Sequence, residues 1–542
     1  MSIGIVSTKY GKLRGEELGG KYEGITVFRS VPYALPPVGE LRFRDPVEPA
    51  AWNGVLDATH PAARAMQDAG TGLEMEPWKS DFYFMGNPPM SEDCLYLSIA
   101  TGAGKPGEKR PVFLWFHGGG LASGYATEIE FDPAELAARG IVVVSVGQRL
   151  NVFGYLALPS LSAEQGGISG NYGLKDEFMA LRWVRENIAS FGGDPDNITL
   201  GGQSGGTAKS TALATSPKAR GMVKRCINQS NLAWARNYQT LKKAEESGRE
   251  YLRNLGLDPD LTPEELRRIP AFRFYQMQRK PEGFGAPGGL PGAMVADGVW
   301  IESESAMENM AKYGSGIDYL SGGNLGESSL RDPGLMPGAG FRDAADFYGY
   351  MKDLLGGRFE KAGFETLWPV SDADVNFRSR ELAARAFSGG HATKMMGGVI
   401  TNRYFGAYRA KTGGKAHTYS YLFAHFTPSL PEEKGTFRDT ENLLAWHSSE
   451  LWYTFASLRE GTPPSRPWTE TDFRLANQIC SYWANFIRTG DPNGEGLPFW
   501  PESGENFGWM YFGDEPAGKD GLDGIDELAL ELIREKGGYP AL

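Results

Sequence analysis

The sequence has few cysteines, no excess of positive charge and no long apolar run. Its 542 residues include three cysteines, Cys94, Cys226 and Cys480, and none of them forms a Cys-x-x-Cys pair. So few cysteines exclude a disulfide framework and favour a reducing compartment. The formal net charge is -12. This acidity argues against a nucleic-acid-binding protein, which needs a basic face, and fits a protein whose partner is a small molecule.

Membrane and metal signals are also missing. No apolar run approaches the length of a membrane span, so we expect no membrane partner. Residues 1–7 lack the basic and apolar regions of a signal peptide, and we expect a cytoplasmic protein. No cluster of histidine and cysteine has metal-ligand spacing, so we expect no metal and no cofactor. The sequence gives no indication of the oligomeric state.

Apolar runs and amphipathic segments alternate along the chain. Residues 111–116 and 141–146 are continuous apolar runs, which are typical of strands buried on both faces. Residues 173–190 place apolar side chains at three- and four-residue spacing, which predicts a helix. Further strands are expected at 223–229, 317–321 and 418–423, and a helix at 472–489. This order predicts an α/β fold with a mostly parallel sheet, and no linker divides residues 1–542, so we expect a single domain.

Two early regions differ from this pattern. Residues 11–15 and 25–28 are short β-type runs beside glycines, which predicts antiparallel hairpins at a sheet edge. Residues 65–90 are rich in methionine and aromatic residues in a loop-like context. A long loop of this composition either lines a pocket or packs against the body of the protein. We favour the pocket wall.

The most informative motif is Gly-Gly-Gln-Ser-Gly-Gly at residues 201–206. It follows a β-type run at 197–200 and precedes a helix-compatible run at 207–214. A Gly-x-Ser-x-Gly pattern between a strand and a helix is typical of a nucleophile elbow. Gly202 and Gly206 would let the strand and the helix approach each other around a strained Ser204. The alternative is an ordinary loop rich in glycine and serine.

A serine nucleophile needs a histidine base and an acid that orients it, in the chain order serine, acid, histidine. His447 lies in a loop that runs into a helix, where it could project over the elbow, and we favour it as the base. The alternatives after Ser204 are His417 and His425, which flank a predicted strand, and His391, which lies in a glycine-rich loop. Glu327 follows a predicted strand and is our choice for the acid, with Asp318 as its rival.

The sequence His-Gly-Gly-Gly at residues 117–120 directly follows a predicted buried strand. Successive glycines let backbone N–H groups point into a cavity, where they can stabilise a developing oxyanion. Gly119 and Gly120, with Gly205 after the serine, would form an oxyanion hole of three donors. His117 precedes the serine in the chain, so we interpret it as a structural residue of this loop and not as the base.

These motifs and several further blocks resemble the type-B carboxylesterase family, which includes cholinesterases and bacterial p-nitrobenzyl esterases. The similar blocks cover residues 28–43, 91–97, 170–176, 191–195, 201–206, 324–328 and 447–450. The resemblance implies an α/β-hydrolase fold, with a large central mixed sheet flanked by helices and insertions that form a gorge over the site. It supports Glu327 as the acid, and it matches Ser230 to a buried serine that supports the acid in relatives.

The sequence departs from this family in two places. Gln203 and Gly205 stand where the family elbow usually has glutamate and alanine. We expect catalysis to survive both changes, with a looser backbone at Gly205. Residues 65–67 also lack the cysteine that pairs with the equivalent of Cys94 in secreted relatives. The absent bridge favours a more mobile loop and a cytoplasmic location.

We therefore predict a serine carboxylic-ester hydrolase that forms an acyl-enzyme with Ser204, His447 and Glu327. The aromatic composition of residues 65–90 favours small to medium apolar, aryl or alkyl esters. One alternative is an amidase, thioesterase or carbamate hydrolase with the same triad, since a fold does not determine the substrate. Another alternative is a non-catalytic binding protein on this fold, which the complete set of catalytic residues disfavours.

Overall fold

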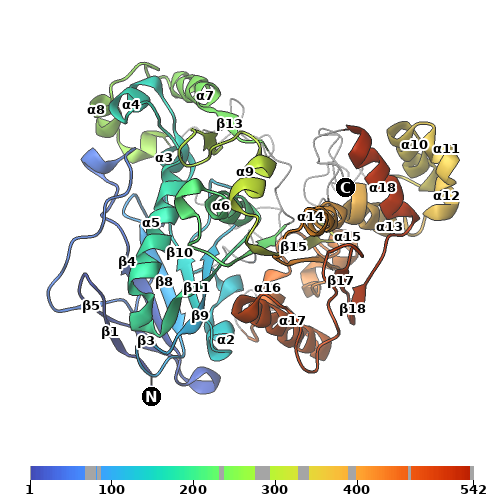
Figure 1. Ribbon diagram of the computed structural model, residues 1–542, viewed down its shortest axis with the longest axis horizontal. Coiled ribbons are helices and arrows are strands. Elements are labelled where there is room, and N and C mark those ends of the chain that lie inside the picture. The colour runs from blue at the N-terminus through green and yellow to red at the C-terminus, as the bar shows by residue number, and fades with distance from the viewer. Residues whose placement is uncertain are drawn as a thin grey trace. The chain divides into compact units, whose positions relative to one another are not determined.

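The computed structural model describes residues 2–67, 81, 87–230, 237–274, 293–327, 341–387, 398–461 and 466–536. They form two compact units (Figure 1). The first unit holds the described residues of Met1–Thr71, Gly86–Ile227 and Ala233–Ile317, and the second those of Gly72–Met85, Asn228–Leu232 and Asp318–Leu542. The prediction of one domain over residues 1–542 stays a prediction.

The first unit is built on a mixed sheet. Its strands, in spatial order, are β11 (Gly193–Gln203), β9 (Arg110–Phe116), β10 (Val142–Val146), β8 (Tyr96–Thr101), β4 (Thr26–Pro32) and β3 (Glu16–Glu17). The pairs formed by β9 with β10 and β11 are parallel, and the pairs from β10 to β3 are antiparallel. The side chains of residues 112–116 in β9 are fully buried. The predicted buried strands and the antiparallel edge are both confirmed.

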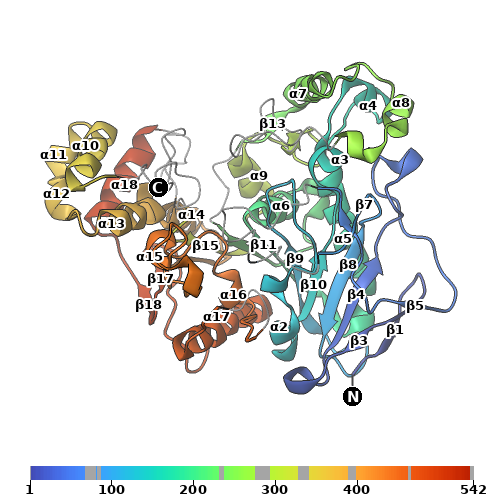
Figure 2. The same ribbon diagram turned by 180° about the vertical axis from the view of Figure 1, so that it is seen from behind.

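Helices and short strands complete the first unit. The helices are α2 (Ala134–Ala138), α3 (Asn151–Tyr155), α4 (Pro159–Glu164), α5 (Tyr172–Asn187), α6 (Gly205–Ala214), α7 (Leu241–Asn254), α8 (Pro263–Arg268) and α9 (Ala306–Tyr313). The short strands are β1 (Ile5–Ser7), β2 (Lys12–Arg14), β5 (Val55–Asp57), β6 (Arg64–Ala65), β7 (Met90–Ser91), β13 (Gln239–Thr240) and β14 (Val295–Ala296). Helices α5 and α6 pack against each other and against β11 (Figure 2).

Helix α5 confirms the predicted amphipathic segment, except that its last turn, Ile188–Phe191, is a 3-10 helix. It differs from the expected pattern because it buries charged side chains as well as apolar ones. Asp176 forms a salt bridge of 2.6 Å with Arg149, and both side chains are buried. Glu177, the next residue, is also fully buried. A charged stretch of sequence therefore lies inside the first unit.

The strands of the second unit are hydrogen-bonded in the order β15 (Asp318–Asn324), β16 (Thr418–Phe423), β17 (Trp509–Phe512) and β18 (Pro516–Lys519). The first two pairs are parallel and the last is antiparallel. Strand β12 (Arg225–Gln229) belongs to the first unit up to Ile227 and to the second from Asn228. The predicted strands at 223–229, 317–321 and 418–423 are confirmed within one or two residues at their starts.

The second unit carries the remaining helices. They are α10 (Ala344–Leu355), α11 (Arg358–Ala362), α12 (Phe364–Leu367), α13 (Val375–Leu382), α14 (Val399–Lys411), α15 (Thr440–Leu443), α16 (Leu451–Thr454), α17 (Glu470–Thr489) and α18 (Gly524–Lys536). Helix α17 confirms the helix predicted at 472–489. Thr469 caps it, because its hydroxyl accepts a hydrogen bond from the Asp472 N–H while the Asp472 carboxylate accepts from the Thr469 N–H.

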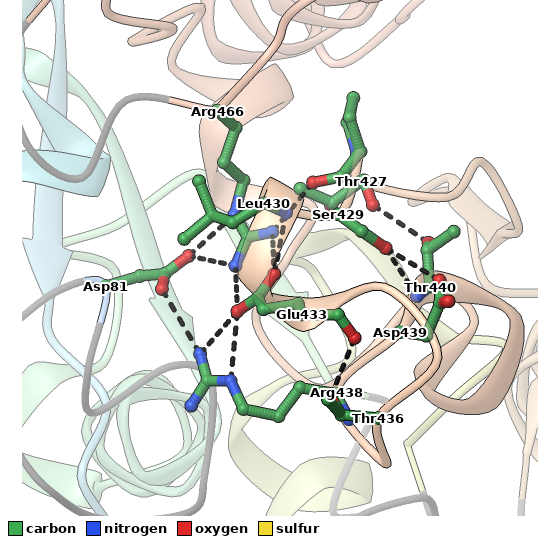
Figure 3. Close-up of polar contacts among 11 residues, drawn as sticks. Asp81, Thr427, Ser429, Leu430, Glu433, Thr436, Arg438, Asp439, Thr440 and Arg466 are labelled. Carbon is green, nitrogen blue, oxygen red and sulfur yellow. Dashed lines mark hydrogen bonds and ion pairs between the residues drawn. The ribbon is translucent and has the colours of Figure 1, made fainter.

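The second unit contains a buried network of charged residues (Figure 3). The guanidinium of Arg466 donates to the Asp81 carboxylate at 2.8 Å, to the Glu433 carboxylate at 2.9 Å and to the Pro428 carbonyl at 2.7 Å. Arg438 donates to the same Glu433 carboxylate at 2.9 Å. The side chains of Arg466, Asp81 and Glu433 are 2–4% exposed. The network joins Asp81 to a segment more than 340 residues further along the chain.

Several sequence predictions can be placed only in part. Of the region 65–90, residues 65–67, 81 and 87–90 are described, and the pocket-wall hypothesis lies mostly outside the described residues. His391 also lies outside them. All three cysteines are free and buried, so Cys94 forms no disulfide. In the part of the chain that the structure describes, no helix is both long and apolar enough to cross a membrane.

Candidate active site

Ser204 lies at the junction of β11 and α6 in the first unit, which confirms the predicted strand–turn–helix context. Strand β11 ends at Gln203 and helix α6 begins at Gly205. Between them Ser204 has φ 54° and ψ −118°, a conformation that L-amino acids adopt rarely and that costs on the order of 1–3 kcal/mol. The serine is therefore held on a sharp turn at the N-terminus of a helix.

The two glycines of the motif allow this turn to form. A Cβ atom on Gly202 would lie 2.2 Å from the carbonyl oxygen of Gly206. A Cβ atom on Gly206 would lie 2.0 Å from the carbonyl oxygen of Phe116, at the end of β9. Either side chain would force backbone segments apart, because real Cβ atoms do not approach backbone oxygens this closely. The close approach of strand and helix that we inferred from the sequence is therefore present.

The glycine loop after β9 packs directly on the start of α6. A Cβ atom on Gly205 would lie 1.9 Å from the Gly120 carbonyl oxygen. Gly119 and Gly120 both have positive φ, 78° and 65°. The Gly119 carbonyl accepts hydrogen bonds from the N–H groups of Ala122 and Ser123. The space beside Gly205 is thus filled by the loop, so the backbone there is confined by packing and not loosened as the sequence comparison suggested.

His117 is a buried structural residue of this loop. Nδ1 of its ring lies 3.0 Å from the Gly118 carbonyl oxygen, and Nε2 lies 3.1 Å from the side-chain amide of Gln148. Burial is the main cause that lowers its pKa well below the ordinary 6.5, and the charge of Lys209 lowers it further. A neutral, fully enclosed imidazole agrees with our interpretation that His117 holds the loop.

Glu327 and His447 meet inside the second unit. Glu327 lies in the turn that follows β15, and its carboxylate forms a hydrogen bond with Nδ1 of His447. The backbone brings the two segments together, because the Gly326 N–H donates to the Ala445 carbonyl at 2.8 Å and Gly326 forms a β-bridge with Trp446. A histidine with a carboxylate on Nδ1 leaves Nε2 for proton transfer.

Two buried residues support this pair, and the sequence did not assign them a role. The side-chain amide of Asn324 donates to the Trp446 carbonyl at 2.8 Å and to the Glu450 carboxylate at 2.5 Å. Burial, with a smaller contribution from the charge of Glu327, raises the pKa of Glu450 to about 7. In the sequence Asn324 follows a predicted strand and begins the family-like block 324–328, but neither feature gave it a role.

The rival base residues are engaged elsewhere. His425 lies between two carboxylates, with Nε2 2.9 Å from Asp472 and Nδ1 2.6 Å from Asp514. His417 is half-exposed and its Nδ1 lies 3.0 Å from the Glu502 carboxylate. Neither ring contacts Glu327 among the hydrogen bonds of the described residues. The geometry therefore favours His447.

The rival acid and the supporting serine also have clear positions. Asp318 begins β15, and its carboxylate accepts a hydrogen bond from the His417 N–H at 2.8 Å, which links it to the start of β16. Ser230 follows β12 with φ 102°, and its N–H donates to the Gly322 carbonyl in β15 at 2.8 Å. Ser230 therefore lies beside the strand that leads to Glu327.

Comparisons with known proteins agree on one family. The sequence profile described as "Carboxylesterase family" matches residues 3–518. Carboxylesterase 4A of Bos taurus is 32% identical over 92% of this chain and 89% of its own length. Para-nitrobenzyl esterase of Bacillus subtilis (strain 168) is 29% identical over 92% and 93%. The crystal structure of Geobacillus stearothermophilus carboxylesterase EST55 at pH 6.8 superposes with a TM-score of 0.70, at 29% identity over 97% and 99% of the chains.

Proposed function

Because this chain belongs to the carboxylesterase family and is an ester hydrolase with the α/β-hydrolase fold, we propose that Ser204 is its nucleophile. The observation that carries this proposal is the backbone of Ser204, strained at a turn between β11 and α6. Such a turn exposes the serine hydroxyl and is found where a hydrolase needs a nucleophile.

In the proposed reaction the Ser204 hydroxyl attacks the carbonyl carbon of the ester while His447 accepts its proton. Glu327 keeps the imidazole in the tautomer that can accept at Nε2 and stabilises the imidazolium that forms. The protonated His447 then gives its proton to the leaving alcohol, and an acyl-serine remains. Water, deprotonated by His447, attacks the acyl carbon. The bond between that carbon and Ser204 Oγ breaks, Oγ takes the proton back from His447, and the carboxylic acid is released. The hydrogen bond between Glu327 and His447 supports these roles.

We propose the N–H groups of Gly119, Gly120 and Gly205 as the oxyanion hole. The positive φ angles of Gly119 and Gly120 and their packing on the start of α6 support this assignment. The N-terminus of α6 adds its partial positive charge at the same place. Loss of one such donor costs about 10²- to 10³-fold in kcat in well-studied hydrolases. Ser230, beside β15, is proposed to support Glu327.

We propose small to medium apolar esters, with aryl or alkyl groups, as the substrates. The name of the Bacillus relative, a para-nitrobenzyl esterase, supports aryl esters. A cytoplasmic location is supported by the three buried, free cysteines, and separation of cell fractions tests it. The formal net charge of -12 supports the expectation of no nucleic-acid partner.

The direct test is hydrolysis of p-nitrophenyl acetate and butyrate by the purified wild type and by Ser204→Ala. We expect turnover by the wild type and a loss of about 10⁶-fold in the variant, as for removal of other serine nucleophiles. The matched control is Ser210→Ala, a buried serine further along α6, which should keep wild-type activity. Equal rates for wild type and Ser204→Ala would exclude Ser204 as the nucleophile.

A further inference from the structure

A fully buried lysine lies under the glycine loop. Lys209 lies on α6, five residues after Ser204, and its side chain is fully buried. Its ammonium nitrogen donates a hydrogen bond of 3.0 Å to the carbonyl oxygen of His117, the first residue of the loop. The same carbonyl belongs to the peptide that leads to Gly118. Burial of an amino group costs free energy, and helix formation alone does not require a lysine at this position. Its hydrogen bond to the loop therefore suggests a role there.

The side chain of Gln148 is the second partner of Lys209. With the amide nitrogen donating to the Val146 carbonyl at 2.7 Å, the amide oxygen accepts from Lys209 at 2.8 Å and from Nε2 of His117 at 3.1 Å. The opposite orientation would set oxygen against oxygen at Val146 and nitrogen against nitrogen at Lys209. The hydrogen-bonding pattern thus fixes the orientation, and Gln148 joins Lys209 to the histidine of the loop.

The charge of Lys209 is not neutralised by a direct ion pair. Within the part of the chain that the structure describes, no carboxylate lies within 4.0 Å of its nitrogen, and both oxygens of the buried Glu177 on α5 have no hydrogen-bond partner. Glu128, in the segment after the loop, is buried and interacts electrostatically with the lysine, and its carboxyl group is hydrogen-bonded to the buried Glu130. Burial lowers the pKa of Lys209 to about 8 and raises that of Glu177 to about 8. At pH 7 Lys209 is therefore charged, and among the described residues it has no direct ion pair.

We propose that Lys209 is a positioning residue for ester hydrolysis: its ammonium group fixes the His117–Gly118 peptide and holds a positive charge behind the oxyanion hole. The inference rests on the proposed function, because it assigns Gly119 and Gly120 as oxyanion donors. The hydrogen bonds of Lys209 to His117 and Gln148 fix the position of the first residue of the glycine loop. The close contact of Gly120 with Gly205 fixes the position of its last residue.

The physical advantage appears when the substrate oxygen becomes negative. A buried cation without an ion pair is poorly solvated in the free enzyme, and its attraction to an anion is stronger in the interior than in water. An oxyanion at the glycine loop would supply the missing negative charge in the transition state alone. An interaction that strengthens only in the transition state raises kcat and leaves KM nearly unchanged.

Lys209→Met tests this inference, with p-nitrophenyl butyrate as substrate. We expect kcat to fall about 10- to 100-fold, which is less than the loss of a direct oxyanion donor, with KM within about threefold of the wild type. The inhibition constant of an alkyl trifluoromethyl ketone, which adds to the serine as a tetrahedral oxyanion, should rise by the same factor. Lys175→Met is the matched control, because Lys175 is equally buried in the first unit but pairs with Asp45 at 2.5 Å.

The pH profile gives a readout that a purely structural role would not affect. Because Lys209 loses its charge as the pH rises through about 8, kcat/KM of the wild type should fall above that pH. In Lys209→Arg, which stays charged, the fall should move to higher pH. Glu177→Gln should keep the fall, because the group that titrates is the lysine, although removing the carboxylate moves the fall to lower pH. The ring of His117 is neutral throughout this range.

The outcomes separate this inference from the proposed function. A wild-type kcat/KM that stays constant from pH 7 to 9.5 would overturn the role of Lys209, and that measurement needs no variant to fold. Unchanged kcat in folded Lys209→Met would overturn it as well, as would a loss that leaves the trifluoromethyl ketone affinity intact. A failure of the proposed function appears differently, as equal activity in wild type and Ser204→Ala.

Discussion

Nδ1 of His447 and the carboxylate of Glu327 form a charge-assisted hydrogen bond, although 120 positions separate them in the sequence. The carboxylate contacts Nδ1, so in the proposed reaction Nε2 is the nitrogen that accepts a proton. In Glu327→Gln the amide can present its N–H to the ring and favour the wrong tautomer. We expect kcat for p-nitrophenyl butyrate to fall about 10³- to 10⁴-fold with little change in KM.

The matched control for this variant is Glu365→Gln, which changes an exposed glutamate in α12 of the same unit. It should keep wild-type kcat. Full activity in Glu327→Gln would show that Glu327 is not the acid, and the same assay on Asp318→Asn would then test its rival.

Gly205→Ala restores the residue that is usual in the family elbow, and we expect it to lower activity here. The new Cβ would lie 1.9 Å from the Gly120 carbonyl oxygen, so the glycine loop would have to move. A displaced oxyanion donor costs about as much as a missing one, so kcat should fall about 10²-fold or more. Gly316→Ala is the control, because no atom lies within 4 Å of its Cβ position. Wild-type kcat in Gly205→Ala would contradict the packing described for this loop.

Arg466→Met should destabilise the protein by about 3–5 kcal/mol, because it leaves the buried carboxylates of Asp81 and Glu433 without their main partner (Figure 3). Thermal and urea unfolding followed by circular dichroism measure this loss. Arg474→Met removes an arginine whose partner, Glu515, is 82% exposed, and it should cost less than about 1 kcal/mol. Equal stability of the two variants would mean that the buried network contributes nothing specific.

His425 should make stability depend on pH. Burial lowers its pKa, but the hydrogen bonds to Asp472 and Asp514 raise it more, so the net pKa lies above the ordinary 6.5. A raised histidine pKa stabilises the folded state fully below pH 6.5, and this stabilisation is lost as the pH rises through the folded-state value. His425→Gln should therefore lose more stability relative to wild type at pH 5.5 than at pH 8.5.

The acid side of this dependence comes from Asp472. Burial raises its pKa, but hydrogen bonds from His425, Thr469 and Tyr453 lower it to below the ordinary 3.8. Its contribution is present above pH 3.8 and disappears as the pH falls through the folded-state value. Urea midpoints from pH 4.5 to 9 measure the contribution of His425, and midpoints below pH 3.8 measure that of Asp472, with His60→Gln, at an exposed position, as the control. A constant gap between wild type and His425→Gln across this range would refute the prediction.

Much of the fold could be predicted from the sequence because its signals are local. The apolar run of β9 indicates a buried strand, and the glycines around Ser204 indicate a tight turn, each within a few residues of sequence. The choice of Glu327 over Asp318 followed from its place after a strand, and the pair with His447 agrees with it. At these positions the structure is the one that the neighbouring residues predict.

The remaining features depend on partners that are distant in the sequence. Nothing around His425 indicates that residues 47 and 89 positions away supply its two carboxylates. A lysine in a helix, such as Lys209, normally faces solvent, and only the small residues on all sides of α6 hinted at burial. Asn324 looked like an ordinary loop residue until its contacts with Trp446 and Glu450 were known.

The most direct test of the central claim is to locate the residue that reacts with a fluorophosphonate, which forms a stable tetrahedral adduct with an activated serine. The purified wild type would be labelled, digested and analysed by mass spectrometry, beside His447→Gln and Ser204→Ala. We predict a single adduct on Ser204, labelling at least about 10³-fold slower in His447→Gln, and none in Ser204→Ala. An adduct on another serine, or labelling of Ser204→Ala at the wild-type rate, would contradict the assignment of the nucleophile.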